Sequence, residues 1–470
     1  MGLSKRGSYP LLESLEIVDA GTGGKSVARY EDRVIFVQKT VPGDIVDVQI
    51  IGKKKKFWEG YPEKFHKYSD KRIEPLCKHF GSCGGCKWQN MSYKDQLFYK
   101  QKQVVENLQR IGKVEIPEIK PILPSEETEY YRNKLEYTFS NARWLEKEEL
   151  DQGDEKKQLK ALGFHVSQRF DKIVNIEHCY LQSDPSNAIR LAIRDYGIKN
   201  GISFFDLRHQ NGFLRNIIIR TSQSGETMLI VIFYHEDEEK RIGLLEHIRE
   251  MFPDITSLLY IINPKGNSTI YDLDVKVFNG EDHIIEKMED LNFRIGPKSF
   301  FQTNTVQACN LYNIVKNYAA LKGDEVVYDL YTGTGTIANF IAKKCKLVIG
   351  IESVPEAIED AKLNSRLNGI NNTEFFAGDI KNVLNEDFIT QWDRPEVIIL
   401  DPPRAGMHIN VVNAILFAEP QRIVYVSCNP ATQARDIELL GNVYKVTEVQ
   451  PVDMFPHTDH VENVVLLEKK

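Results

Sequence analysis

The sequence predicts an α/β protein in which a doubly wound parallel sheet forms the carboxyl-terminal part of the chain. Three observations lead to this prediction. From about residue 296 onward, apolar strand-like segments alternate with helical ones; residues 130–295 alternate apolar and polar side chains; and residues 9–67 hold closely spaced short strands with glycine-rich turns. The chain has 470 residues, which is too long for one ordinary domain. We expect three domains, over 1–67, 68–295 and 296–470.

Residues 1–67 are expected to form a small β-barrel, because short, closely spaced strands can pair into one closed sheet. Here Lys53–Lys56 precede Phe57 and Trp58, a run that fits either a solvated hairpin tip or a surface that contacts an RNA backbone and stacks its bases. This segment carries 12 Lys and Arg against 9 Asp and Glu, whereas the whole chain has a net charge of −7. A basic module on an acidic body is compatible with phosphate contact. The expected strands are 15–18, 26–30, 34–37 and 45–51.

Residues 68–295 are expected to form a mixed α+β domain. A helical pattern covers residues 93–111, and we expect this helix to pack on the carboxyl-terminal domain. Strands are predicted at 135–139, 216–221 and 228–233, where apolar and polar residues alternate. Neither the helix nor the strands reveal chemistry.

Cysteines indicate a metal site in this central domain. Three of the seven cysteines, Cys77, Cys83 and Cys86, crowd into ten residues, and Cys179 lies far along the chain. An odd cysteine count in a chain without a signal-peptide pattern argues against a disulfide framework. Four thiolates can bind an iron–sulfur cluster or a zinc ion, and the spacing alone leaves both open.

A glycine-rich turn follows the first strand of the carboxyl-terminal domain, in the segment DLYTGTGT. Gly333 and Gly335 allow the backbone to turn tightly before a helix and to approach a ligand closely. The next strand ends at Glu352, about 20 residues later, where a carboxylate can bond a ribose diol. The order of strand, turn, helix and acid indicates a nucleotide-like cofactor. The expected strands are 326–330, 347–351, 373–376, 397–400, 423–426 and 464–467, and the expected helices are 336–343, 355–367 and 411–417.

Two further strand ends favour S-adenosyl-L-methionine over a dinucleotide. The turn lacks the third glycine of the dinucleotide fingerprint. Asp379 follows one strand and can meet an adenine ring, and Asp401 follows another in the segment Asp-Pro-Pro-Arg. Asp-Pro-Pro at a strand end is typical of methyltransferases, because the prolines fix the loop so that Asp401 faces the crevice.

Cys428 follows the next predicted strand, at the same sheet edge as Asp401. A lone thiol is usually core filling. Methyl transfer to carbon 5 of uracil, however, needs a thiolate that adds to carbon 6 and a base that removes the carbon 5 proton. For the base we considered His457, His460 and Glu462. The two histidines have metal-ligand spacing but no third ligand nearby, whereas Glu462 precedes the final strand and returns to the crevice.

Five motifs in this order, GPKSFFQTN (296–304), DLYTGTGT, DPPRAG, SCNPAT and HTDHVE, resemble the RNA 5-methyluridine methyltransferases of the TrmA/RumA type. The resemblance implies a Rossmann-like class I methyltransferase domain that uses S-adenosyl-L-methionine. It implies that Cys428 is the nucleophile and Glu462 the proton-abstracting base. It also implies a TRAM-like (OB-like) RNA-binding barrel and a four-iron cluster. The implied cofactor contacts are Gln302, Tyr331, Glu352, Asp379 and Asp401, and the implied cluster ligands are Cys77, Cys83, Cys86 and Cys179.

The cluster and the barrel resemble the branch of this family that methylates uridine in 23S ribosomal RNA. Transfer RNA is the alternative substrate. A different class of function is an iron–sulfur RNA-binding sensor with an inactive methyltransferase fold, against which the intact set of Cys428, Asp401 and Glu462 argues. We expect a cytoplasmic protein, because the sequence shows no membrane span and no signal peptide. The resemblance implies RNA as its partner, and the sequence gives no sign of an obligate protein partner.

Overall fold

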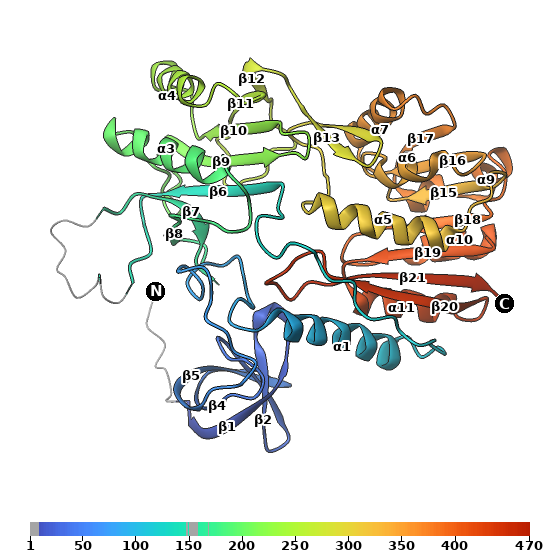
Figure 1. Cartoon of the computed structure of the whole chain (residues 1–470), viewed down its shortest axis with the longest axis horizontal. Helices are drawn as coiled ribbons and strands as arrows, with labels where there is room; N and C mark the ends of the chain where they lie inside the picture. The colour runs from blue at the N-terminus through green and yellow to red at the C-terminus, as the bar shows by residue number, and fades with distance from the viewer. Residues whose placement is uncertain (1–8, 147–148, 150–157, 168) are drawn as a thin grey trace.

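The amino-terminal strands close into a barrel, at the lower left of Figure 1. The computed structural model describes residues 9–146, 149, 158–167 and 169–470, so the first eight residues of the predicted barrel domain lie outside the described part. All four expected strands are present, and a fifth, β5, was not predicted because Gly60 and Pro62 are poor strand residues. The strands, in the order β1-β2-β3-β5-β4, are β1 (Leu11–Ala20), β2 (Ser26–Tyr30), β3 (Arg33–Val37), β4 (Ile45–Lys53) and β5 (Phe57–Lys67).

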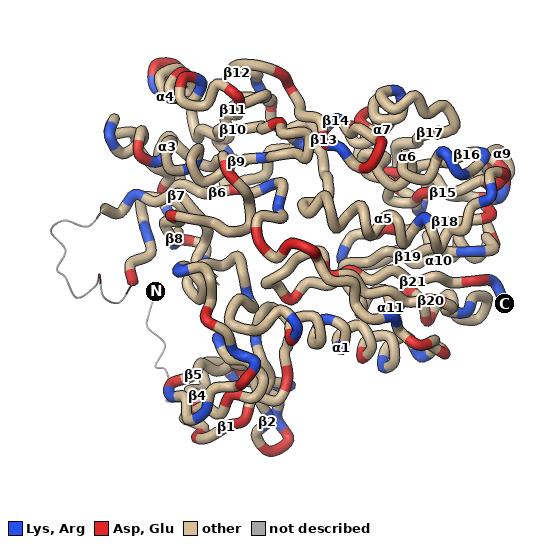
Figure 2. Tube along the Cα trace, in the orientation of Figure 1, with Lys and Arg blue, Asp and Glu red and all other residues tan. Residues whose placement is uncertain are grey.

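The lysine run joins β4 to β5, so its backbone is the hairpin tip that the sequence allowed. The tip keeps cations beside an aromatic ring: Arg33 and Lys53 lie 5.0 and 4.1 Å from the ring centroid of Trp58. Figure 2 shows acidic and basic segments interspersed over the whole chain, in keeping with the modest net charge of −7. Attraction to an anionic partner would therefore have to come from local groups such as this tip.

Helix α1 (Tyr93–Ile111) runs from the barrel towards the carboxyl-terminal domain (Figure 1). Ser92 caps its first turn by accepting a hydrogen bond from the backbone N–H of Asp95. The helix packs against α11 (Pro430–Leu440) of the carboxyl-terminal domain.

The central domain is a seven-stranded sheet that is buried on both faces. One set of alternating side chains on β9 and β10, including Ile217 and Val231, packs with helices α3 and α4, and the other set, including Ile218 and Ile230, packs with the carboxyl-terminal domain. The elements are, in sheet order, β12 (Lys276–Gly280), β11 (Ser257–Ile262), β10 (Thr227–Phe233), β9 (Leu214–Thr221), β6 (Lys134–Ser140), β7 (Ala161–His165) and β8 (Ile173–Asn175), with α3 (Ser186–Lys199) and α4 (Glu238–Met251).

The carboxyl-terminal domain is the predicted doubly wound sheet, with an antiparallel hairpin at one edge. Strands β17-β16-β15-β18-β19 are parallel, and β21 inserts antiparallel between β19 and β20. The bounds are β15 (Val326–Leu330), β16 (Leu347–Glu352), β17 (Thr373–Ala377), β18 (Val397–Leu400), β19 (Arg422–Ser427), β20 (Tyr444–Val452) and β21 (Glu462–Lys469).

Helices cover both faces of this sheet, and a small hairpin joins it to the central domain (Figure 1). All three expected helices are present, whereas α5, α8, α9, α11 and β20 were not predicted. The helices are α5 (Thr305–Ala319), α6 (Thr336–Ala342), α7 (Pro355–Leu367), α8 (Ile380–Val383), α9 (Glu386–Gln391) and α10 (Ile409–Ala418), and the hairpin is β13 (Ile284–Met288) with β14 (Leu291–Ile295). Among the described residues, no helix combines the length and the apolar character that crossing a membrane requires.

Candidate active site

The glycine-rich turn between β15 and α6 has the backbone conformation of a ligand-binding turn. Tyr331, Gly333 and Gly335 all have positive φ angles, of 66°, 56° and 74°. A Cβ atom on Gly335 would lie 2.8 Å from the Cβ of Ala361, so a side chain there would collide with α7. The glycines therefore allow the turn to pass close to α7 and to begin α6 at once.

Glu352, at the end of β16, is fixed beside this turn. Its Oε2 accepts a hydrogen bond from the Gly333 N–H at 3.3 Å, and its Oε1 accepts from the Ser353 N–H and hydroxyl at 2.7 and 2.8 Å. Asp379 follows the adjacent strand β17, where it caps α8 and pairs with the Nζ of Lys381 at 2.8 Å. The structure thus brings Tyr331, Glu352 and Asp379 to one edge of the sheet.

Gln302 belongs to a loop that reaches the same edge from the central domain. Its carbonyl accepts a hydrogen bond from the Asn133 side chain at 2.9 Å, and Asn304 caps α5. The hydroxyl of Thr334, in the glycine-rich turn, donates to the Phe300 carbonyl at 3.5 Å. The loop with Gln302 therefore borders the turn, although the two are 30 residues apart in the chain.

Asp329 is a further site residue, which we did not select from the sequence. It is 1% exposed, and its Oδ2 accepts a hydrogen bond from the Thr332 hydroxyl at 2.5 Å. Among the described residues, nothing hydrogen-bonds to its Oδ1. Burial, and then the nearby Asp401, raise the pKa of Asp329 to about 7. A carboxylate inside the apolar strand 326–330 was the signal that could have identified it.

Cys428 and Glu462 lie where β19 and β21 meet. The last pair of their antiparallel ladder is Ser427 with Asn463, so Cys428 directly follows one member of this pair and Glu462 directly precedes the other. Glu462 is close enough to raise the pKa of the Cys428 thiol. Asp401 follows the neighbouring strand β18, which pairs with β19 in parallel. The structure thus brings the predicted nucleophile, the predicted base and Asp401 to one edge of the sheet, where β18 and β19 end and β21 begins.

Burial and like charges shape the chemistry of these three groups. Burial, and then the nearby Glu462, raise the pKa of the half-buried Cys428 thiol to about 11, and Arg404 opposes the shift. Burial, followed by Asp401, holds the pKa of Glu462 well above its usual range, and burial raises the pKa of Asp401 to about 7. A carboxylate with a raised pKa is a stronger base, and a nearby cation would favour ionisation of all three groups.

The loop with Arg404 is held over the site by α11. The Asn429 side chain donates to the Arg404 carbonyl at 3.0 Å, and Asp436 accepts from the Met407 N–H at 2.8 Å. The Arg404 guanidinium lies 2.7 Å from Nδ1 of His460. His457 bonds to Gln96 instead, so the two histidines do not form a common site.

The four cysteines predicted to bind metal line one cavity of about 140 Å³. Cys179 is buried and the other three are half-buried. Burial raises the pKa of Cys83 and Cys86 to about 12. The loop 77–89 and the segment 177–181 meet here, together with Arg132, whose Nε is buried without a hydrogen-bond partner among the described residues. Binding of a cation would keep these sulfurs ionised.

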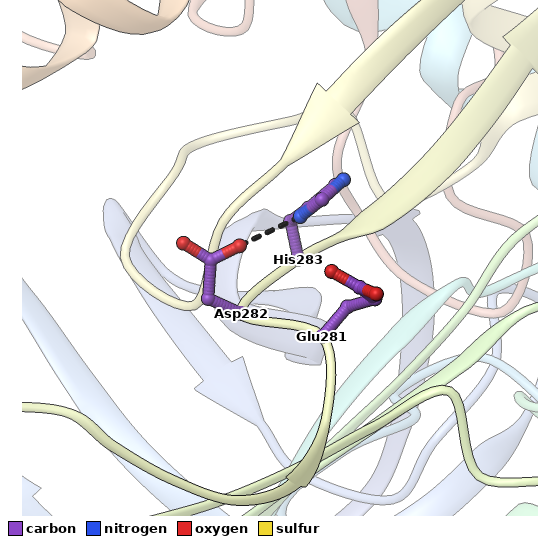
Figure 3. A group of neighbouring side chains, drawn as sticks. All are labelled: Glu281, Asp282 and His283. Atoms are coloured by element: carbon purple, nitrogen blue, oxygen red, sulfur yellow. Dashed lines mark hydrogen bonds and ion pairs between the residues drawn. The ribbon is translucent and has the colours of Figure 1, made fainter.

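The sulfurs are spread over more than a single-ion site. Among the described residues, the one group that brings three metal-ligand atoms within 4.8 Å of one another is Glu281, Asp282 and His283, so no three of the sulfurs do so. That group lies on an exposed turn before β13, where Asp282 already pairs with His283 at 2.7 Å (Figure 3). Asp282 also pairs with Arg294 at 2.8 Å. We assign it no site.

Comparisons with known proteins match most of the chain. The family model described as tRNA (Uracil-5-)-methyltransferase matches residues 221–470. A protein of Bacteroides thetaiotaomicron, described as an uncharacterized RNA methyltransferase, is 60% identical over 448 residues, which cover 95% of this chain and 99% of that relative. A protein of Chlorobaculum tepidum, also described as an uncharacterized RNA methyltransferase, is 39% identical over 433 residues, covering 91% and 90%.

A solved structure is similar over the same length. It is the Pyrococcus abyssi tRNA (uracil-54, C5)-methyltransferase in complex with S-adenosyl-L-homocysteine. The TM-score is 0.75 at 27% sequence identity, and the match covers 96% of this chain and 100% of that chain. The three parts of the fold are thus similar to those of a single known protein.

Proposed function

This chain belongs to the TrmA/RumA-type family of RNA (uracil-5-)-methyltransferases, and from that premise we propose that it forms 5-methyluridine with S-adenosyl-L-methionine as the methyl donor. The family resemblance and the class I methyltransferase fold expected from the sequence are confirmed by these comparisons. The observation that carries the proposal is that Cys428 and Glu462 directly adjoin the last residue pair of β19 and β21, while Asp401 directly follows the neighbouring strand β18.

The proposed reaction uses Cys428 first and Glu462 last. After the thiol has lost its proton to solvent, Sγ bonds to carbon 6 of uracil and the electrons of the 5,6 double bond move towards O4. S-adenosyl-L-methionine would supply the methyl group that carbon 5 takes, and its methyl–sulfur bond would break to leave S-adenosyl-L-homocysteine. Glu462 then removes the proton from carbon 5, the double bond re-forms and Sγ leaves as a thiolate. The reaction therefore needs no oxidant or reductant.

The carboxyl edge of the sheet is the proposed cofactor site, with contacts from Gln302, Tyr331, Glu352, Asp379 and Asp401. Glu352 is held rigidly enough to orient a ribose diol. In the free protein, the ionised forms of Asp329 and Asp401 are unfavourable, because burial opposes their ionisation. A positively charged sulfonium ligand would compensate these charges, which gives a physical reason for placing them there.

For the four-cysteine site we propose a four-iron cluster, with zinc as the alternative. Zinc with thiolates about 2.3 Å away holds its sulfurs about 3.8 Å apart, whereas a cluster binds each thiolate to a different iron. The wide spread of the sulfurs therefore favours the cluster. Because methyl transfer moves no net electrons, the group would serve structure. Protein purified without oxygen should be brown and contain iron and sulfide; a colourless protein with one equivalent of zinc would contradict this assignment.

The proposed substrate is 23S ribosomal RNA in the cytoplasm, with residues 1–67 as a TRAM-like RNA-binding barrel. The presence of this barrel and of the cysteine site supports the ribosomal branch of the family. Transfer RNA is the second candidate, because the similar solved structure is named as a transfer-RNA enzyme and is matched over its entire chain. The alternative of an inactive iron–sulfur sensor does not explain why nucleophile and base lie together where β19 and β21 meet.

Mapping 5-methyluridine in 23S ribosomal RNA and in transfer RNA, from cells with and without this gene, tests the proposal. Loss of a modified uridine from 23S ribosomal RNA is the expected result. A loss confined to transfer RNA would select the second candidate. Unchanged 5-methyluridine in both RNAs, together with no methyl transfer by the purified protein to RNA from the deletion strain, would contradict the activity.

A further inference from the structure

Glu462 begins β21, directly after the connection of residues 453–461 that leads back from β20. Val452, the last residue of β20, pairs with Glu462 across the hairpin. Asp453 therefore follows the residue that lies opposite the proposed base, and directly paired residues in an antiparallel ladder are only about 4.5–5.5 Å apart. Whatever fixes Asp453 also fixes the backbone beside Glu462.

Asp453 is held by α1, outside the carboxyl-terminal domain. The Nζ of Lys100 lies 2.6 Å from its Oδ1, and both side chains are 0% exposed. The hydroxyl of Tyr93, also on α1, donates to Oδ2 at 2.9 Å. Lys100 Nζ makes a second bond, at 3.0 Å, to the carbonyl of Phe455. One lysine thus ties two residues of the 453–461 connection to a helix 353 residues away in sequence.

Other segments hold the middle and the far end of the connection. Gln96, one turn before Lys100 on α1, accepts from the His457 N–H at 2.8 Å. The carbonyl of His457 accepts from the N–H groups of Lys87 and Trp88, the two residues after Cys86, at 2.8 and 3.0 Å. Asp459 accepts from the Gly23 N–H of the barrel at 2.6 Å. The connection to the base is therefore positioned by parts of the chain that take no part in the chemistry.

We propose that Lys100 and Asp453 are positioning residues for Glu462. The proposal rests on the proposed role of Glu462 as the base. A fully buried ion pair adds little net stability, because the loss of hydration opposes the attraction between its charges. It does fix one geometry, and a displacement of about 1 Å at a reacting group can cost about 10²-fold in rate. Loosening this pair should therefore impair proton removal more than cofactor binding.

The test compares Lys100→Met and the double variant Lys100→Met/Asp453→Asn with the wild type. The double variant leaves no uncompensated buried charge, so it keeps the test valid if the single variant folds poorly. Lys94→Met, which removes an exposed lysine from the same helix, is the matched control. Glu462→Gln is the reference for a protein without the base. RNA from a strain lacking the gene is the methyl acceptor, and full-length protein is purified without oxygen.

Three quantities are measured: product release, RNA–protein adduct that resists denaturant, and binding of S-adenosyl-L-homocysteine. In both Lys100 variants we expect product release to slow about 10- to 100-fold, adduct to accumulate as in Glu462→Gln, and ligand binding to change less than about twofold, within the scatter of distant substitutions. Lys94→Met should behave as the wild type.

Two results would overturn the positioning role: a lower melting temperature with wild-type product release and no adduct, or equal losses of ligand binding and product release. The control with Glu462→Gln separates this failure from a failure of the proposed function. If Glu462→Gln itself gives no adduct while it binds RNA and ligand, the role of the base is wrong. If Glu462→Gln accumulates adduct and the Lys100 variants do not, only the positioning role is wrong.

Discussion

The two thiol sites of this protein are built in opposite ways. Cys428 is a single half-buried thiol among carboxylates, and the pairing of β19 with β21 sets its position near Glu462. The four-cysteine site is assembled from the loop 77–89 and the distant segment 177–181, with Arg132 beside it. The end of a regular ladder thus positions the proposed nucleophile within one domain, whereas loops from distant parts of the chain build the proposed metal site.

The largest expected effect comes from removing the thiol of Cys428, at the carboxyl edge of the sheet. Cys428→Ala should lower methyl transfer at least about 10³-fold, because no adduct can form, while S-adenosyl-L-homocysteine still binds. Cys309→Ala, which removes a half-buried thiol from α5 of the same domain, is the control and should retain activity. Near-normal turnover by Cys428→Ala, measured with radiolabelled methyl donor, would refute the nucleophile.

The second prediction concerns the four-cysteine site. Cys179→Ala should lose the bound metal group and lower the melting temperature, by about 2–4 °C for each kcal/mol of lost binding energy. The control Cys345→Ala removes another buried cysteine, from the carboxyl-terminal domain, and should keep its metal. Metal analysis and thermal unfolding check both variants. If Cys179→Ala keeps full metal content, Cys179 is not a ligand.

The candidate site at the carboxyl edge of the sheet was largely predictable from the sequence, because its residues lie at the ends of apolar strands. Each of Glu352, Asp379, Asp401 and Cys428 follows or ends such a strand, and parallel strands bring their carboxyl ends to one edge. Asp329 was missed because it lies inside a strand rather than after it. The register that brings Cys428 near Glu462 required the structure, since a one-residue slip would separate them.

What the sequence could not predict are contacts between distant segments. Spacing grouped Cys77, Cys83 and Cys86 and left Cys179 as a distant candidate for a fourth ligand, whereas the structure brings all four to one cavity. Lys100 and Asp453 are 353 residues apart, and neither stands in a recognisable motif. Strand β5 was missed because pairing with both β3 and β4 outweighs the poor local propensity of its glycine and proline.

The rate of adduct formation should also depend on pH, through the thiol of Cys428. Because the pKa of Cys428 is raised to about 11, the thiolate fraction falls as the pH falls. Below that pKa, the rate of adduct formation should rise about tenfold for each pH unit. Single-turnover adduct formation between pH 7 and 9, with saturating methyl donor, measures this slope. A rate that is independent of pH over this range would show that the bound substrate lowers the thiol pKa before attack.

The smallest expected effect is on the free energy of unfolding, and it concerns Asp329 at the proposed cofactor site. Because the folded pKa of Asp329 is raised from 3.8 to about 7, its stabilising contribution is full below about pH 4 and is lost as the pH rises through 7. Asp329→Asn removes the charge and should raise the free energy of unfolding by about 1–2 kcal/mol at pH 8 and by less at pH 5.

Urea unfolding of Asp329→Asn at the two pH values measures this difference, and Asp324→Asn, at an exposed position two residues before the same strand, is the control. The same substitution should weaken binding of S-adenosyl-L-methionine, because the proposed sulfonium ligand loses a buried counter-charge. A variant that is both more stable and weaker in binding would show that this carboxylate is retained for the ligand at the expense of the fold. Equal stability of wild type and variant at both pH values would mean that Asp329 is already neutral or compensated in the free protein.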